Sequence, residues 1–219
     1  MAERNDPSSL LHKAAKAALA PLGAQRRGRS RFWYVDNGWH AIAIEFTRAS
    51  FAKGAGLTLG VCWFWSAKAS WSFDALVEHA PYVAFDTAER FAPKIAGIAE
   101  MAARHVVATQ AVLQTLQSAY EATQPTTPAG NWEHVHSGVL AALLHKTEAA
   151  TRHLQDAIGP TDGIGWRIER NEFCETLLAH LAAGQDCRTL IETRIRMGRG
   201  LLDLPAQAGP VLPGGRAPA

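Results

Sequence analysis

Between Arg31 and Trp65, hydrophobic residues recur at every second position, which is the spacing of β-strands. Aromatic and β-branched residues, which favour strands, dominate this stretch. Three strands are expected, over residues 32–35, 39–47 and 57–65. The Asn37-Gly38 pair favours a type I′ turn, so the first two strands should form a hairpin. The pattern therefore predicts a three-stranded antiparallel meander.

The residues that follow can extend this sheet. Pro81–Phe85 fits a further strand at the sheet edge, where a proline is tolerated. The preceding segment, Ser70–Ala80, fits either a short helix or an irregular excursion. The sheet is thus expected to have three to five strands.

Helical spacing of apolar residues appears on both sides of the sheet segments. Near the N-terminus a helix is expected to start with Ser8 or Ser9 as its cap. A second apolar stripe runs from Phe91 to Tyr120, behind Asp86 and Glu89, which resemble a capping box. This stripe predicts one long helix or two nearly collinear ones.

The rest of the chain is predicted to be helical, after a linker rich in proline and glycine at Gln124–Gly130. Four helices are expected, over residues 132–144, 147–158, from 166 to a closing glycine at 184, and about 185–202. The first two should form a helical hairpin, in which Gly138 allows a close approach. From Pro205 onward the chain is so rich in proline, glycine and alanine that we expect disorder.

Together these elements predict an α+β fold. An antiparallel β-sheet packs with the N-terminal helix and the long helix, and an all-helical C-terminal half follows. The expected division is an α+β region over residues 8–123, a helical region over 131–204 packed on the first as one unit, and a disordered tail over 205–219.

Composition adds little about partners. The 219 residues carry a formal net charge of +2, which is too mild to require nucleic acid or an acidic membrane. No apolar run reaches 18 residues, so no membrane-spanning segment is expected. Three cysteines without metal-type clustering suit a reducing compartment. We therefore expect a soluble, cytoplasmic protein.

Residues able to carry chemistry do not form a recognisable catalytic or cofactor motif. His134 and His136 would share a face on a strand, but on the expected helix they point about 200° apart and cannot chelate one metal. Glu169, Glu172 and Glu175 recur every three residues, as either an acid–base pair or a solvated helix face. Cys62 lies in an apolar strand, where a buried thiol is expected. No catalytic residue, cofactor or metal ligand is therefore predicted.

Aromatic residues are the stronger hint of binding. Trp33, Trp39, Trp63 and Trp65 occupy both faces of the predicted strands, and core packing explains most of them. Some could instead contact a partner, because aromatic residues dominate interface anchors.

A basic segment precedes the first strand, with arginines at 26, 27, 29 and 31. It is either a phosphate-binding patch or a charged lead-in that protects a sheet edge. The candidate binding surface therefore consists of Trp33, Trp39, Trp63, Trp65, Arg27 and Arg29.

Several stretches resemble a known family. They are PLGAQRRGRSRFWYVDNG, AIAIEFTRASFAKGAGLTLGVCWFW, an F-x-x-x-I-x-x-I-A helix from Phe91, a Trp132…His136-Ser137-Gly138 helix and a closing R-x-R-x-G-R-G-L-L-D-L-P. Over most of residues 8–205 the chain is similar to bacterial proteins with a domain of unknown function of the DUF4304 type. The resemblance implies a small cytoplasmic α+β protein with no assigned active site, so no functional residue is carried over. Ala24 departs from it, because an aromatic residue is expected there.

Two functions remain open from the sequence. The first is a non-catalytic binding or protein-interaction module, like a bacterial immunity or accessory protein, with another protein as its partner. The alternative is an enzyme or nucleic-acid-associated protein that uses the basic segment Arg26–Arg31. The missing catalytic motifs favour the first, and the mild charge disfavours nucleic acid. The sequence does not determine the oligomeric state.

Overall fold

A computed structural model describes residues 6–50, 52–126, 131–209 and 211–214. The chain divides into two compact units. The first comprises Met1–Cys62 and Leu76–Ala111, and the second comprises Trp63–Ala75 and Val112–Ala219. The division differs from the expected one, because residues 63–75 and 112–123 belong with the C-terminal helices.

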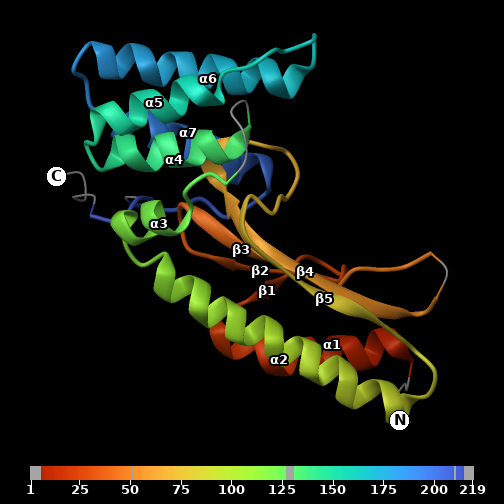
Figure 1. Ribbon diagram of the computed structural model, residues 1–219. Coiled ribbons are helices and arrows are strands. Elements are labelled where there is room, and N and C mark those ends of the chain that lie inside the picture. The colour runs from red at the N-terminus through yellow and green to blue at the C-terminus, as the bar shows by residue number, and fades with distance from the viewer. Residues whose placement is uncertain (1–5, 51, 127–130, 210, 215–219) are drawn as a thin grey trace. The chain divides into compact units, whose positions relative to one another are not determined.

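The sheet is a five-stranded antiparallel meander (Figure 1). Its strands, in spatial order, are β1 (Gln25–Arg26), β2 (Phe32–Asp36), β3 (His40–Glu45), β4 (Gly54–Trp63) and β5 (Ala75–Ala84). The α+β fold and the antiparallel sheet are thus confirmed. Most of the ambiguous segment before Pro81 belongs to β5, and β1 adds a short edge strand within the basic segment.

The Asn37-Gly38 hairpin is present, but its turn is not type I′. Trp33 pairs with Ile44 across the hairpin. Gly38 has a φ of 87°, whereas Asn37 is not in the left-handed region that a type I′ turn requires. The Asp36 carboxylate accepts the Gly38 N–H at 3.0 Å. This side-chain contact stabilises a different turn.

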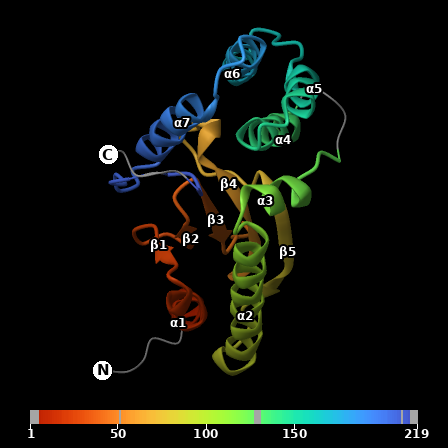
Figure 2. The same ribbon diagram turned by 90° about the vertical axis from the view of Figure 1, so that its left-hand side faces the viewer.

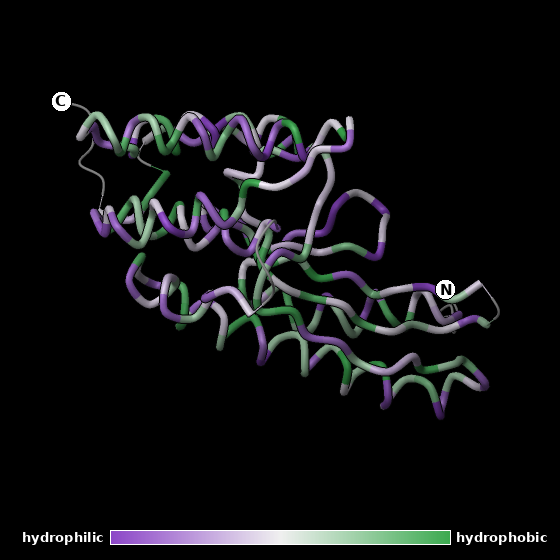
Figure 3. The backbone as a smooth tube through the Cα atoms, turned by 45° about the horizontal axis from the view of Figure 1, so that its top comes forward, coloured by the Kyte–Doolittle hydropathy of each residue, from purple (hydrophilic) through white to green (hydrophobic). Residues whose placement is uncertain are grey.

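Helices α1 (Pro7–Leu19) and α2 (Ala88–Val112) cover one face of the sheet (Figure 2). Their apolar stripes meet the inward residues of the strands, and hydrophobic and hydrophilic positions alternate along the helices in Figure 3. The core of this unit includes Leu11, Ala15, Leu19, Trp33, Val35, Ile42, Ile44, Leu57, Leu59, Phe91, Ile95, Ala102 and Val106.

Two predicted helix caps are shifted, by two or three residues at α1 and by one residue at α2. Asp6, and not Ser8 or Ser9, caps α1, because its side chain accepts the N–H groups of Ser8 and Ser9. At the start of α2, the Thr87 hydroxyl accepts the Arg90 N–H at 3.4 Å, so Asp86 is not the cap. A short 3-10 helix, η1 (Ala20–Leu22), ends at Gly23 with a φ of 77°.

The second unit is helical. It contains η2 (Phe64–Ser66), α3 (Leu116–Ala122), α4 (Trp132–Leu143), α5 (Thr147–Ala157), α6 (Gly165–Ala182) and α7 (Arg188–Leu201). The long apolar stripe is therefore two helices, α2 and α3, because Thr115 starts α3 with a capping box. Residues 127–130 of the predicted linker lie outside the described residues. No helix in the described ranges has the length and apolar content needed to cross a bilayer.

The predicted helical hairpin is confirmed as α4 and α5. A Cβ atom on Gly138 would lie 2.7 Å from Cγ of Leu154, so the two helices approach more closely than an alanine would permit. The tail after Pro205, for which we expect disorder, contains two buried residues in its described part. Val211 and Leu212 are each only 4% exposed, because these two apolar side chains pack instead of remaining in solvent.

Candidate functional site

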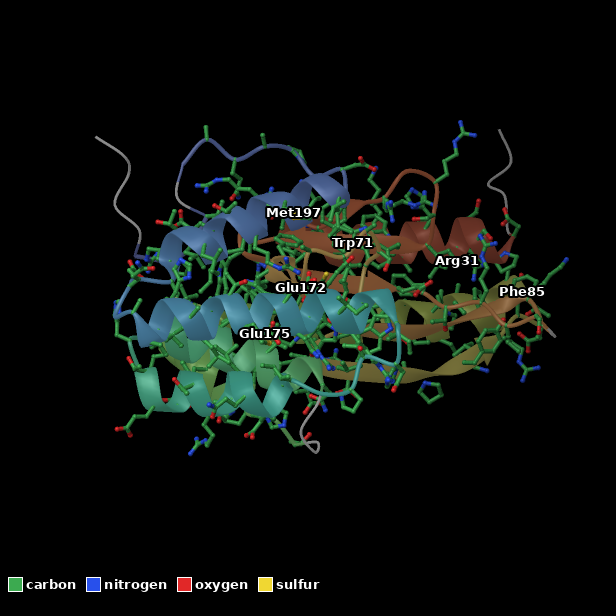
Figure 4. All side chains as sticks on the ribbon, turned by 90° about the horizontal axis from the view of Figure 1, so that it is seen from above. Arg31, Trp71, Phe85, Glu172, Glu175 and Met197 are labelled. Carbon is green, nitrogen blue, oxygen red and sulfur yellow. The ribbon has the colours of Figure 1, made fainter. Side chains whose placement is uncertain are left out.

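A cavity of about 950 Å³ opens on the second unit between α6 and α7. Both helices pack against α4, and the loop after η2 closes one side. Figure 4 labels Glu172 on α6 and Met197 on α7, the two helices that border the cavity. Its lining residues are Ala67, Lys68, Ala69, Ser70, Trp132, Trp166, Glu169, Glu172, Phe173, Thr176, Arg194, Met197 and Leu201. This size is in the usual range for ligand sites.

The α6 wall combines aromatic and acidic side chains. Trp166, Glu169, Phe173 and Thr176 follow at spacings of three and four residues, which places them on one face of the helix. Phe173 is buried, whereas 48% of the Trp166 side chain is exposed. The wall therefore has an apolar base and an open aromatic rim.

The α7 wall follows the same periodicity. Arg194, Met197 and Leu201 are spaced by three and four residues. Met197 is 54% exposed and Leu201 is 41% exposed. Together with Trp166, they surround the cavity with apolar side chains that face solvent.

Gly198 fixes the position of α7. A Cβ atom at this residue would overlap with the backbone carbonyl of Phe64 in η2. The Nε of Arg194 donates a hydrogen bond to the Trp65 carbonyl oxygen at 3.0 Å. The helix is thus held against η2 by a backbone contact and a side-chain hydrogen bond.

Asp74 organises the loop on the third side. Its buried carboxylate accepts hydrogen bonds from the Trp63 N–H at 3.0 Å and from the Ser72 hydroxyl at 2.9 Å. It also forms an ion pair of 3.0 Å with Lys68. The Lys68 ammonium then lies 4.6 Å from the centroid of the Trp132 ring. The charge of Lys68 is therefore largely neutralised within the protein.

His136 stacks on the ring of Trp132, which lines the cavity. The two rings stack with centroids 5.8 Å apart, and the Trp65 indole N–H donates to Nδ1 of His136 at 3.0 Å. Burial lowers the pKa of His136 to about 4, against the opposing effect of Asp74. Neutral His136 therefore carries its proton on Nε2 and acts as a hydrogen-bond acceptor at Nδ1.

Arg194 is one of the charged residues that line the cavity. Its guanidinium carbon lies 4.4 Å from the centroid of Phe173. Burial lowers its pKa, while the carboxylate of Glu169 acts in the opposite direction. Only its Nε forms a hydrogen bond with another described residue. The terminal nitrogens are available to a ligand.

The lining is suited to binding more than to covalent chemistry. Among the described lining residues there is no cysteine or histidine that could pair as nucleophile and base. In the described part of the chain, no three His, Cys, Asp or Glu residues gather as metal ligands. The arrangement offers apolar contact area with a few polar groups that orient a ligand.

The four tryptophans of the candidate binding surface are core residues. Trp33 is 5% exposed, Trp39 3%, Trp63 1% and Trp65 0%. Trp63 and Trp65 stack with centroids 4.6 Å apart. These four side chains cannot form a contact surface, because almost none of their area is accessible.

The basic segment is only partly available. Arg27 and Arg29 are exposed. Arg26 donates from Nε to the Ser30 carbonyl oxygen at 2.6 Å and from a terminal nitrogen to that of Arg29 at 2.8 Å. Arg26 therefore closes the turn before β2. The structure does not bring Arg27 or Arg29 together with the four tryptophans into one surface.

The remaining candidates have structural positions. His134 lies 3.9 Å from the Asp156 carboxylate, whereas His136 is in the core. Cys62 is buried, as expected. Of the three glutamates, Glu169 and Glu172 line the cavity and Glu175 does not.

The sequence does not identify the residues that supply the exposed apolar surface and the positive charge of the cavity lining. The sequence marks Trp166 only as part of a helix, and it does not single out Arg194, Met197 or Lys68 as binding residues. The repeated spacings on α6 and α7 are a usable signal. Their convergence with Lys68 cannot be inferred, because it depends on how the two helices pack on α4.

The chain matches no family model, no curated protein and no solved structure. The resemblance to proteins of the DUF4304 type therefore stays a prediction.

Proposed function

We propose that this protein is a non-catalytic, cytoplasmic interaction module, in the manner of bacterial accessory or immunity proteins. Its binding site is the α6/α7 cavity, and its ligand is a short segment of a partner protein. The observation that carries the proposal is the cavity of about 950 Å³ with Trp166, Met197 and Leu201 exposed at its rim.

Composition supports a protein partner. Tryptophan, methionine and arginine are enriched in protein interfaces, and all three occur in this lining. Trp166 offers a large apolar surface with few rotatable bonds, which is favourable for an anchor contact. An apolar side chain of the partner would displace water from Trp166 and Met197, and the terminal nitrogens of Arg194 would donate to a backbone carbonyl or carboxylate oxygen.

Thiol chemistry is consistent with a reducing compartment. Cys62, Cys174 and Cys187 are all buried, and none of the three forms a disulfide bond within the described residues. Burial raises the pKa of the Cys174 thiol to about 12, which removes its nucleophilic character. These thiol properties support a cytoplasmic location for the proposed interaction module.

The proposal is tested by selecting peptides from a displayed random library on the full chain. Selected peptides are then titrated against the variants Trp166→Ala and Met197→Ala. Since interface anchors contribute more than about 1 kcal/mol, each substitution should weaken binding on the order of tenfold. Val107→Ala is the matched control, because Val107 is 52% exposed on α2 and does not line the cavity.

Two results would oppose this function. One is a library that yields no peptide binding to the full chain. The other is a set of peptides that bind the Trp166 and Met197 variants as tightly as the unmodified protein.

A further inference from the structure

A second cavity, in the sheet-containing unit, concentrates positive charge. It has a volume of about 390 Å³ and lies beside the start of α1 and the β3–β4 connection. Its charged lining residues are Arg31, Arg48, Lys53 and Asp6. Three cations against one carboxylate leave a net charge of +2 around the cavity.

Within the part of the chain that the structure describes, the cations of this cavity form no ion pair. Among the described residues, no carboxylate lies within ion-pair distance of Arg31, Arg48 or Lys53. Asp6 is committed elsewhere, since its side chain accepts the Ser8 and Ser9 N–H groups at 3.0 and 3.2 Å. It also occupies the N-terminus of α1, so the helix end itself is not the site.

Arg31, which is labelled in Figure 4, lines the cavity and is held in place by its contacts with Gly54 and Ser8. One terminal nitrogen donates to the Gly54 carbonyl oxygen at 2.6 Å, and the other lies 3.3 Å from the Ser8 hydroxyl oxygen. Its Nε is buried without a hydrogen-bond acceptor among the described residues. Burial, and then the nearby charge of Arg48, lower the pKa of Arg31. The guanidinium groups of Arg31 and Arg48 therefore repel each other, and no described carboxylate forms an ion pair with either.

We propose that this cavity binds a phosphate group, as inorganic phosphate or as a small phosphate monoester, through Arg31, Arg48 and Lys53. A phosphate monoester carries about 1.5 to 2 negative charges at neutral pH, and this charge is close in size to the net charge of +2 around the cavity. Guanidinium groups fit phosphate oxygens in pairs, and a lysine adds a mobile point charge. The site is independent of the α6/α7 cavity, since its residues belong to the other unit.

The site differs from the basic segment Arg26–Arg31 expected from the sequence. Only Arg31 of that segment lines the cavity, and Arg48 and Lys53 come from the connection between β3 and β4. Specificity for phosphate would come from three cations around one cavity, and not from a run of arginines along the chain.

The test is calorimetric titration of the full chain with inorganic phosphate at constant ionic strength. Arg48→Gln and Lys53→Gln remove exposed side chains, so both variants should fold. Because a hydrogen bond to a charged group is replaced, each should raise the dissociation constant about tenfold. Arg48→Lys keeps the charge but loses the paired donors, so its loss should be smaller than that of Arg48→Gln.

The controls are Arg27→Gln and Arg104→Gln, which remove exposed cations of the same unit outside this cavity. Their dissociation constants should stay within about twofold of the unmodified value, because screened surface charges contribute little. A parallel titration with phenyl phosphate identifies the source, since tighter binding than inorganic phosphate indicates an ester. The absence of saturable heat, or an equal loss in the control variants, would overturn the proposal.

Discussion

At the scale of single residues, His136 is a buried polar group that connects two tryptophans of the second unit. It accepts the indole N–H of Trp65 and stacks on Trp132, so it joins the core to the wall of the α6/α7 cavity. Both contacts form with a neutral ring. The protonated ring would lose its acceptor at Nδ1 and place a charge in a buried position.

The neutral state of His136 predicts a dependence of stability on pH. Burial lowers the folded-state pKa to about 4, whereas an unfolded histidine has a value near 6.5. The unfolded chain therefore binds protons more readily between these values. The contribution is fully present above pH 6.5 and is lost as the pH falls toward 4, by roughly 2 kcal/mol between pH 7.5 and 5.

Urea unfolding at pH 7.5 and pH 5 measures this effect. His136→Gln retains an acceptor for Trp65 and cannot titrate, so its loss of stability on acidification should be smaller by that amount. His145→Asn is the control, because His145 is exposed and asparagine tolerates its φ of 57°. Parallel losses in the unmodified protein and His136→Gln would contradict this role.

The sequence predicts the burial of single residues better than contacts between residues that are far apart in the chain. The sequence indicates a buried Cys62 in an apolar strand, and Cys62 is 3% exposed. The environment of Trp132 could not be predicted. It depends on Lys68, which is distant in the sequence and is held by Asp74.

At the scale of secondary-structure elements, the contact between α7 and η2 depends on one glycine. Gly198 touches the Phe64 carbonyl, and the space for a side chain is absent. Gly200 lies two residues further along the same helix, and a Cβ atom there would meet no neighbouring atom within 4 Å. The two glycines therefore form a matched pair for substitution.

Gly198→Ala should destabilise the protein by about 1–3 kcal/mol, because α7 must move away from η2. Gly200→Ala should be neutral or stabilising by up to about 1 kcal/mol, since alanine favours the helix and meets no obstacle. Denaturant unfolding of both variants provides the comparison. Equal stability of the two variants would show that α7 and η2 are not in close contact at Gly198.

Helices and strands in which hydrophobic residues recur at a regular spacing are predictable from the sequence. Elements in which this spacing is weak are not. Alternation in β2, β3 and β4 and the stripes of α4 and α5 indicate the correct element types. β1 has only two residues, which is too short for a pattern. The sequence leaves the element type of the β5 segment ambiguous. In the structure Leu76, near the start of β5, has a φ of 49°, and the sequence does not indicate this local turn.

At the scale of the whole molecule, sequence composition places the boundary between units at a linker. The structure instead assigns Trp63–Ala75 to the helical unit, where Asp74, Trp65 and Lys68 make their contacts. A division made of discontinuous segments cannot be recognised from composition, because its cause is contact between residues far apart in the sequence.

The burial of all three cysteines predicts the thiol reactivity of the folded chain. Cys62 is 3% exposed, Cys174 0% and Cys187 2%. Burial also raises the pKa of Cys187. A thiol reagent at pH 8 should therefore react slowly with the native protein and should titrate three thiols after unfolding. Rapid modification of one thiol in the native state would contradict this arrangement.

The central claim is that the α6/α7 cavity binds a partner segment, and the methionine methyl groups offer its most direct test. The chain has three methionines, of which Met197 borders the cavity and Met101 packs on the core of the other unit. Methyl NMR spectra of methionine-labelled protein would be recorded during titration with a selected peptide, with Met197→Leu to assign the signal.

The Met197 signal should shift in a saturable manner, with an apparent affinity equal to that from direct titration, while the Met101 signal stays unchanged. A saturating peptide that leaves the Met197 signal in place would contradict the claim that this cavity is the binding site.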